Sequence, residues 1–570
     1  MTEGIDQDTY KRLAAERIIN TNIGAFDQLT FISQRAINGQ LAHMWQPPNS
    51  ILRKIDIKPY GDDAPGYFFT ADLNPPTVNL SLGPNKQTVI YCINIKRGTI
   101  GWYEGVGPIA KPKTEDLGVS RLALRVNMAF DQLESSKAPD SIKRAVENVE
   151  DYTADLIPSV NGIDQNQSNF NLSTKAQIQF NGLIEYYLGV LREPGENGTP
   201  ADHNIIHYTA TAKNSQVFNA APTCAPTSLN FQNLPFVINE SDRTSPNGVL
   251  GGKNSMLVYL QMTDGHNMPN ALLEPSANWV MPPFDETSDE YDGTVCLSKA
   301  SFLDGFLLSR LAILNSESTW VVDEAWWKAK DLGFTNEYRV YGHLGLNAND
   351  LQDSFFKDYQ WKLTSQENGV RRYEYSKTHR KDDNDGLWRV YQEGRTSNAL
   401  TIPEGLDSSG KCAMKVTGST EVETYIHLDG MGEIGKTTCT AKCTWEANVI
   451  LDGVDEGELK ITVDSPQTVV SSIVDQSFAY PDIMNDTKTR CEDMFKNSDL
   501  NNVKAGLEKL FTGSWAFVFA QGRDFFIDKA FFNHEGDLLC QLKYKSQGSG
   551  NPVQPSNPVQ PSSQARFRRG

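Results

Sequence analysis

The chain has 570 residues, 39% of them hydrophobic and 10% aromatic, so it is too apolar to be wholly disordered and long enough for about two to four domains. Its 53 lysines and arginines against 71 aspartates and glutamates give a net charge of −18, which repels phosphate backbones and argues against nucleic-acid partners. No stretch approaches the run of about 18 apolar residues that crosses a bilayer as a helix. The N-terminus lacks the charged and then apolar pattern of a signal peptide, so we expect a cytoplasmic protein.

Two helices are predicted near the start of the chain. The first covers residues 8–22, where apolar side chains recur at helical spacing. Residues 26–41, FDQLTFISQRAINGQL, predict a strand and then the second helix, with Ser33 at its N-cap position. A proline pair at 47–48 ends this helix.

The strand, cap and helix recur 265 residues later, in YDGTVCLSKASFLDGFLLSRL at 291–311. Ser298 takes the position of Ser33, and two phenylalanines take the positions of two aliphatic helix residues. These matches are Phe302 with Ile37 and Phe306 with Leu41. A repeat of this kind indicates duplication. We therefore expect two related halves, residues 1–270 and 271–545.

Strands dominate the rest of the chain. Apolar runs bounded by Gly, Pro and Asn predict them in five stretches: 51–103, 122–130, 255–262, 335–470 and 514–545. One long helix with an apolar face, built on Phe180, Leu183, Ile184 and Tyr187, is predicted between strand runs. Residues 546–570, rich in Pro and Ser with NPVQPS twice, are predicted to be a disordered tail.

These elements predict an α+β fold. Antiparallel-type strands dominate, and a few long amphipathic helices stand between strand runs rather than after each strand, which argues against a doubly wound parallel sheet. A twisted sheet wrapped on a long helix leaves an elongated apolar seam between them. Such a seam either packs as core or holds an apolar ligand.

One motif has the form of a phosphate-binding loop. Residues 430–437, GMGEIGKT, match G-x-x-x-x-G-K-T, in which Lys436 would contact a nucleotide. That loop needs a following helix, whereas TCTAKCTWEANVIL is β-branched and alternates like the return strand of a hairpin. The pattern therefore favours a hairpin turn over an NTP-dependent enzyme.

No other pattern indicates catalysis or a metal. The eight cysteines stand singly, mostly in apolar runs, which is typical of free buried thiols. His203 and His207 are four residues apart, but HNIIHYTATA has the pattern of a strand and lacks the glutamate of zinc proteases. We expect no cofactor, no metal and no enzymatic activity.

Three segments together resemble a known family. They are residues 26–41, the pair MLVYLQMTDG (256–265) and 291–311, and SWAFVFAQGRDFFIDKAFFNHEGDLLCQLKYK (514–545). They are similar to the forty-seven-kilodalton accessory protein of clostridial neurotoxin gene clusters and to its relatives in fungi and other bacteria. The resemblance implies a tubular lipid-binding (TULIP) fold, in which a strongly bent antiparallel sheet wraps a long helix around an apolar tunnel. The family offers no catalytic motif to carry over, and the Pro-rich tail departs from it.

Two functions are compatible with this fold. One is non-enzymatic binding of a lipid or another apolar small molecule, as a carrier or membrane-surface adaptor, with each buried CH₂ contributing about 0.8 kcal/mol. The other is a structural or toxin-accessory assembly component with a filled tunnel and a protein partner or a homo-oligomeric state. Candidate lining residues share the apolar helix faces: Ile37, Leu41, Met44, Leu183, Ile184, Tyr187, Phe302 and Phe306. The alternative for each is ordinary packing between helix and sheet.

Overall fold

A computed structural model describes most of the chain. The described residues are 6–80, 88–105, 107–127, 130–134, 151–155, 159–163, 166–169, 172–191, 207–211, 226–239, 252–282, 291–330, 335–345, 358–453, 459–464, 467–475, 481–497 and 525–544. The tail predicted at 546–570 lies outside them.

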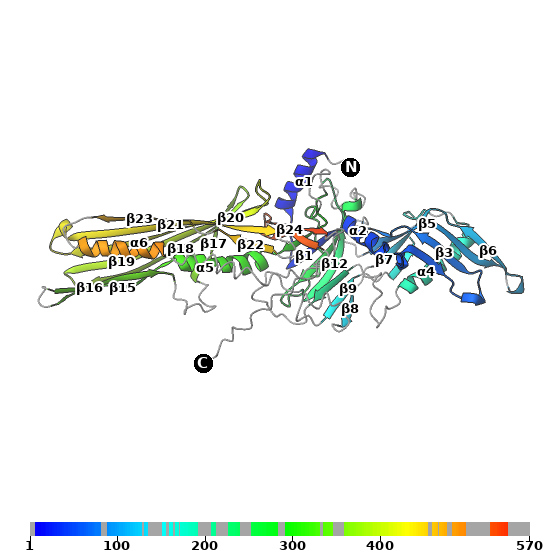
Figure 1. The fold of residues 1–570 in the computed structure, drawn as a ribbon, viewed down its shortest axis with the longest axis horizontal. Helices are drawn as coiled ribbons and strands as arrows, with labels where there is room; N and C mark the ends of the chain where they lie inside the picture. The colour runs from blue at the N-terminus through cyan, green and yellow to red at the C-terminus, as the bar shows by residue number, and fades with distance from the viewer. Residues whose placement is uncertain are drawn as a thin grey trace.

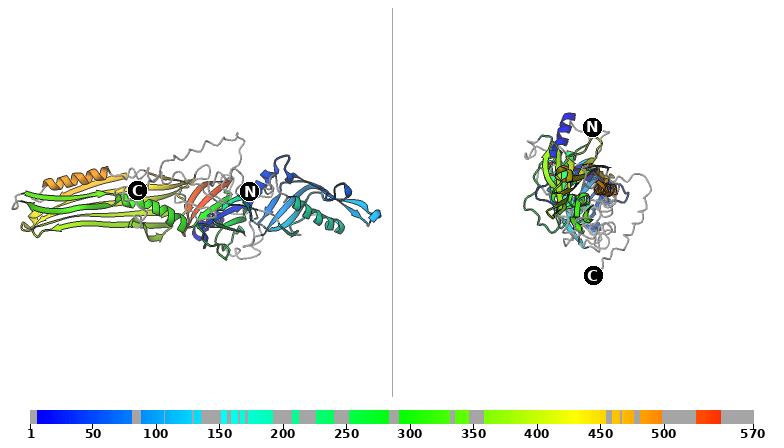
Figure 2. Two further views of the ribbon diagram at one scale, coloured as in Figure 1. Left: turned by 90° about the horizontal axis from the view of Figure 1, so that it is seen from below. Right: turned by 90° about the vertical axis from the view of Figure 1, so that its left-hand side faces the viewer.

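The molecule is elongated, with one sheet at its centre and a wing on each side (Figures 1 and 2). We call these parts the central sheet, the N-terminal wing and the C-terminal wing. The ladders in all three are antiparallel. The predicted fold, mostly antiparallel strands with few helices, is therefore confirmed.

The N-terminal wing is a seven-stranded sheet contacted by helix α4 (Thr174–Leu191). Its strands are β2 (Lys54–Ile57), β3 (Phe68–Leu73), β4 (Thr77–Asn79), β5 (Thr88–Glu104), β6 (Lys111–Asp116), β7 (Ser120–Asn127) and β10 (Ser159–Ile163). A separate three-stranded sheet consists of β8 (Phe130–Glu134), β9 (Asp151–Asp155) and β11 (His207–Thr211). In β3 every second side chain is buried, as expected of a sheet with one covered face.

The central sheet has the strand order β12-β13-β1-β14-β25-β24. Its strands are β1 (Gln28–Ser33), β12 (Ser228–Leu234), β13 (Met256–Met262), β14 (Gly293–Leu297), β24 (Phe525–Phe532) and β25 (Leu538–Tyr544). The two repeated units are neighbours in it, since β1 pairs with β14. They exchange equivalent hydrogen bonds: Ser33 N donates to Asp292 O at 2.8 Å, and Ser298 N donates to Asp27 O at 2.9 Å.

The C-terminal wing is built from very long strands. A hairpin of β15 (Trp320–Lys330) and β16 (Thr335–Leu344) accompanies a seven-stranded sheet. The sheet strands are β17 (Lys362–Glu367), β18 (Val370–Asn384), β19 (Trp388–Pro403), β20 (Cys412–Leu428), β21 (Lys436–Gly453), β22 (Leu459–Val463) and β23 (Gln467–Asp475). At 15 to 18 residues, β18 to β21 each extend about 50–60 Å. Helix α5 (Leu308–Ser318) lies near the central sheet, and α6 (Pro481–Lys496) lies farther out (Figure 1).

The helices predicted near the N-terminus are both present, as α1 (Gln7–Asn20) and α2 (Gln34–Trp45). Ser33 caps α2 as predicted, because its hydroxyl accepts a hydrogen bond from Ala36 N at 3.2 Å. Ser298 makes the matching bond, with Ser301 N at 3.2 Å. The helix after Ser298 differs from the prediction in form: Ala300–Leu307 is a π-helix, labelled η9, which continues directly into α5. Single 3-10 turns complete the set: η1 (Ile51–Arg53), η2 (Gly61–Asp63), η3 (Gly107–Ile109), η8 (Gly252–Asn254) and η13 (Gly432–Gly435).

Candidate functional site

A helix covers the inner face of each wing, and we call the two contact zones the N-terminal seam and the C-terminal seam. The N-terminal seam lies between α4 and strands β2, β3 and β5. Leu183, Ile184 and Tyr187 of α4 are buried in it. The ring of Phe180 meets that of Phe69 edge to face at 5.1 Å. Burial raises the pKa of the Tyr187 phenol, as expected where the surroundings are apolar.

Helix α2 connects the central sheet to this wing. Ile37 and Leu41 are buried on its inner face, and Met44 is partly buried against the same cluster. The amide of Asn38 holds β4 through two hydrogen bonds, accepting from Val78 N at 2.7 Å and donating to Val78 O at 3.2 Å. The three α2 positions predicted to line a tunnel therefore lie where the N-terminal wing joins the centre.

The C-terminal seam lies beneath η9 and α5. Phe302 and Phe306 are both buried there, with ring centroids 5.7 Å apart, and Phe302 also packs against Phe532 at 6.1 Å. The guanidinium of Arg310 lies 4.0 Å from the ring centroid of Phe306. A π-helix of this length is rare, and such segments occur often at functional sites.

One continuous apolar cluster contains both seams. It runs from the inner face of α4 through α2 and the central sheet to η9, α5 and the inner faces of β18 to β21. All eight predicted lining residues belong to this cluster or pack against it. The structure thus places them along one apolar interior, at three separate points of it.

The sequence reasoning missed two polar side chains at the inner end of the C-terminal seam. Arg371 and Tyr373 lie two residues apart on β18, so both point to the buried face of the sheet. Arg371 donates from Nη1 to the carbonyl of Asn533 at 2.9 Å. Burial lowers the pKa of Arg371 and raises that of Tyr373 to about 12. The alternation of VRRYEY contains the signal, because it gives Arg371 the same parity as two tyrosines.

A buried polar lattice closes the outer end of the same seam. Asn398 of β19 donates to Oδ1 of Asn315 and to the hydroxyl of Ser318, both at 2.8 Å. The hydroxyls of Thr319 and Tyr375 lie 2.9 Å apart. Beyond this lattice the wing interior continues as two smaller apolar clusters beneath α6.

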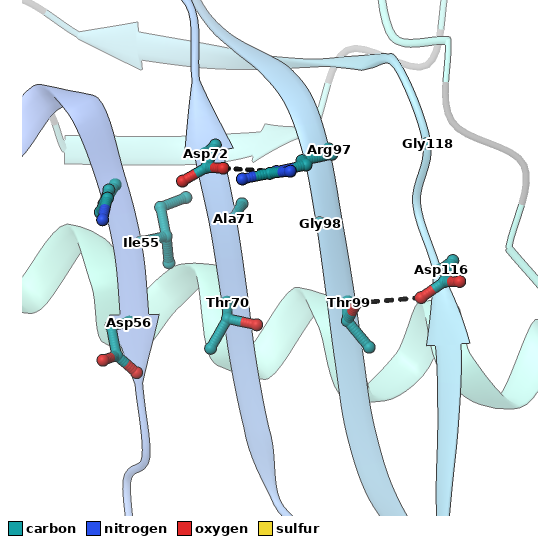
Figure 3. A pocket seen from close by; sticks show the side chains of 11 residues that line it. Ile55, Asp56, Thr70, Ala71, Asp72, Arg97, Gly98, Thr99, Asp116 and Gly118 are labelled. Carbon is teal, nitrogen blue, oxygen red and sulfur yellow. Dashed lines mark hydrogen bonds and ion pairs between the residues drawn. The ribbon is translucent and has the colours of Figure 1, made fainter.

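The opposite face of the N-terminal sheet carries a polar hollow of about 540 Å³ (Figure 3). Two of its three carboxylates accept hydrogen bonds across strands: Asp72 accepts from Nε of Arg97 at 2.5 Å, and Asp116 accepts from the Thr99 hydroxyl at 2.9 Å. Because these pairs satisfy one another on an open surface, the hollow has the character of a solvated sheet face rather than of a binding site.

The nucleotide-binding interpretation of residues 430–437 is wrong. These residues form the turn between β20 and β21, and Lys436 opens strand β21 opposite His427. Gly430 and Gly432 adopt positive φ angles of 137° and 57°, which suit a turn. Without a following helix the loop lacks the amides and dipole that hold phosphate.

The remaining motif residues are accounted for where the structure describes them. His207 lies on β11, and His203 lies outside the described residues. Seven cysteines are free and buried, as predicted, and Cys224 lies outside the described part. Among the described residues no group of three His, Cys, Asp or Glu side chains could hold a metal, and no helix is long and apolar enough to cross a membrane.

Comparison with known proteins agrees with the resemblance seen in the sequence. No family model and no curated protein matches the chain. The chain is similar to P47 of Clostridium botulinum E1, with 10% identity, a TM-score of 0.42, and 90% of this chain and 98% of that chain covered. It is also similar to P47 from Clostridium botulinum A2, with 12% identity, a TM-score of 0.39, and 92% of this chain and 98% of that chain covered. A lipopolysaccharide binding protein has 10% identity and a TM-score of 0.30, with 91% of this chain and 99% of that chain covered.

The resemblance to the clostridial protein is therefore confirmed as a resemblance. Identities and TM-scores this low do not show membership of its family. The architecture rests instead on the strand order and hydrogen-bond register of the chain itself.

Proposed function

We propose that the protein binds a lipid or another apolar small molecule between helix and sheet, without catalysis, as a carrier or membrane-surface adaptor. The observation that supports this most is the single apolar cluster that follows the undersides of α4, α2, η9 and α5 from one wing to the other. An acyl chain placed along it would gain about 0.8 kcal/mol for each buried CH₂.

The residues proposed to line the ligand are those predicted from the helix faces. Their burial supports an apolar surrounding, and their division among three helices gives three places where a chain could pack. They are Ile37, Leu41 and Met44 on α2, Leu183, Ile184 and Tyr187 on α4, and Phe302 and Phe306 on η9.

We also infer that residues 1–270 and 271–545 are related halves that each supply one wing. The strand order of the central sheet supports this. From the edge to the centre, the first half contributes β12, β13 and β1, and the second half contributes β24, β25 and β14 in the matching order. The reciprocal bonds of Ser33 and Ser298 have the same symmetry. Two related halves would provide two related seams.

The second candidate function is an assembly component with a filled interior, and the outer part of the C-terminal wing favours it. The ring of Trp320 packs directly on the backbone of Gly394, because a Cβ added to Gly394 would lie 2.5 Å from that ring. Its indole N–H donates to Gln392 at 3.2 Å. Side chains packed in this way leave little space for a ligand there. A protein partner, a homo-oligomer or contact with a membrane surface would then carry the function.

Native mass spectrometry of the purified full chain, with extraction and lipid analysis of its cargo, tests the proposal. We expect a stoichiometric amphiphile. An apo mass that stays unchanged after incubation with mixed lipids would contradict lipid binding and favour the assembly component.

A further inference from the structure

In the part of the chain that the structure describes, the inner end of the C-terminal seam holds two buried hydrogen-bond donors without an acceptor. Within the described residues, Nη2 of Arg371 and the hydroxyl of Tyr373 are buried and make no hydrogen bond. The two side chains are 1% and 3% exposed, so bulk water does not serve them. Leaving such groups unsatisfied destabilises the folded state, and more so for a charged group. Two unsatisfied donors on one face of the same strand indicate that an acceptor is missing.

The position of Arg371 is fixed by a tight turn. Gly536 has a φ of 91°, and a Cβ there would lie 3.3 Å from Cζ of Arg371 and 3.0 Å from the side chain of Lys299. Lys299 directly precedes η9, so the guanidinium lies beside the start of the π-helix. Tyr373 belongs to the same apolar cluster as Phe302 and Phe306 of η9. The two donors therefore lie at the head of the seam that Phe302 and Phe306 line.

The charges around Arg371 limit what the acceptor can be. Among the described residues Arg371 forms no ion pair, and the carboxylates that act on its charge from a distance are those of Glu404, Glu535 and Asp537. Glu404 accepts from the ring of His534 at 3.0 Å, and Asp537 accepts from Lys299 N at 2.8 Å. These carboxylates repel any anion brought to the guanidinium, and they repel a doubly charged phosphate more strongly than a singly charged acceptor.

We propose that the C-terminal seam binds a fatty acid, whose carboxylate accepts hydrogen bonds from Arg371 and Tyr373 while its acyl chain packs against Phe302 and Phe306. A carboxylate is an acceptor with two oxygens, so one can face each donor. The inference rests on the proposed function and names its ligand class. It also gives Nη2 of Arg371 and the hydroxyl of Tyr373 an acceptor that the described residues do not supply.

The test compares oleate with oleyl alcohol on full-length protein delipidated on a hydrophobic resin, by isothermal titration calorimetry. Tyr373→Phe removes only a hydroxyl that makes no hydrogen bond, so the fold should be kept. We expect it to weaken oleate binding about tenfold and to leave oleyl alcohol binding unchanged. The native protein should prefer oleate over the alcohol.

Tyr375→Phe is the matched control. It lies on the same strand face, but its hydroxyl is bonded to Thr319 at 2.9 Å. This variant should lose stability and keep its oleate affinity. Arg371→Met should reduce oleate binding further. If Arg371→Met does not fold, Tyr373→Phe alone decides the test.

The outcomes separate this inference from the function on which it rests. Equal binding of oleate and oleyl alcohol, or native oleate affinity in Tyr373→Phe, would overturn the fatty-acid assignment and leave apolar-ligand binding intact. Binding of neither compound to the native protein would overturn both.

Discussion

The N-terminal and C-terminal seams share a scaffold and differ in their ends. Beneath α4 the described interior is apolar, with the buried phenol of Tyr187 among its side chains. Beneath η9 and α5 the apolar stretch has a polar boundary on each side, Arg371 at the inner end and the lattice of Asn398 at the outer end. The described part of the N-terminal seam is thus apolar, and the C-terminal seam is an apolar stretch bounded by polar groups at both ends.

The strand register gives the distance between these two polar boundaries. Tyr375 pairs with Asn398, so the lattice lies four residues along β18 from Arg371, or roughly 13 Å. Under the proposal, an acyl chain longer than this would have to fold back or leave the seam. Under the proposed function, this difference would suit a neutral apolar molecule to one wing and an acidic amphiphile to the other.

The largest effect is expected from Leu183→Ala in the N-terminal seam. The side chain is fully buried on α4, and its removal should cost about 3 kcal/mol of folding free energy in delipidated protein. If the seam also holds a ligand, the cost should be smaller in lipid-loaded protein, because the ligand can fill the space. Urea unfolding followed by tryptophan fluorescence measures both values.

Ile178→Ala is the control for this change. Ile178 lies on the same helix but is 65% exposed, so its loss should stay within about 0.5 kcal/mol. An equal cost of Leu183→Ala with and without lipid would make Leu183 ordinary core and remove it from the lining.

A smaller effect is expected from Asn398→Ala in the polar lattice. The change leaves Oδ1 of Asn315 and the hydroxyl of Ser318 without a donor in a buried place, at a cost of about 2 kcal/mol. The thermal unfolding midpoint measures it. Ser397→Ala, the exposed neighbour, should leave the midpoint unchanged. A midpoint that does not move in Asn398→Ala would show that the lattice does not stabilise the wing.

Local patterns made part of this architecture predictable. The caps at Ser33 and Ser298 and the hairpin at 430–437 each depend on a few adjacent residues, and the sequence contains all of them. The π-helix was not predicted, because the spacing of Phe302 and Phe306 also fits an α-helix. Periodicity alone cannot tell these two helices apart.

The polar ends of the C-terminal seam depended on distant contacts. Arg371 is buried because a turn 162 residues away supplies the carbonyl of Asn533, and Asn315 meets Asn398 across 83 residues. In the sequence, an arginine within a strand of the form VRRYEY is most simply a solvated side chain. Only the order of the strands brings these groups to the two ends of one apolar stretch.

The smallest effect concerns pH and separates the two repeated units. Asp27 and Asp292 hold equivalent positions, but Asp27 pairs with His266 at 2.8 Å and Asp292 with Arg35 at 3.7 Å. The hydrogen bond from His266 to Asp27 raises the pKa of His266 above its ordinary value. A raised pKa means that the folded state holds the proton more tightly, so the pair stabilises the protein fully below about pH 6.5. The gain is lost as the pH rises through the higher pKa of the folded state.

His266→Gln should remove this pH-dependent step. The ring is largely exposed, so the step should be on the order of a few tenths of a kcal/mol, and urea titrations on either side of neutral pH measure it. Arg35→Gln is the control, and it should leave the pH-dependent step in place because it does not touch the pair of His266 and Asp27. A pH step that survives in His266→Gln would place the titrating group elsewhere. A step that disappears would show that two units with matching backbone bonds differ in their response to pH, through a single histidine in place of an arginine.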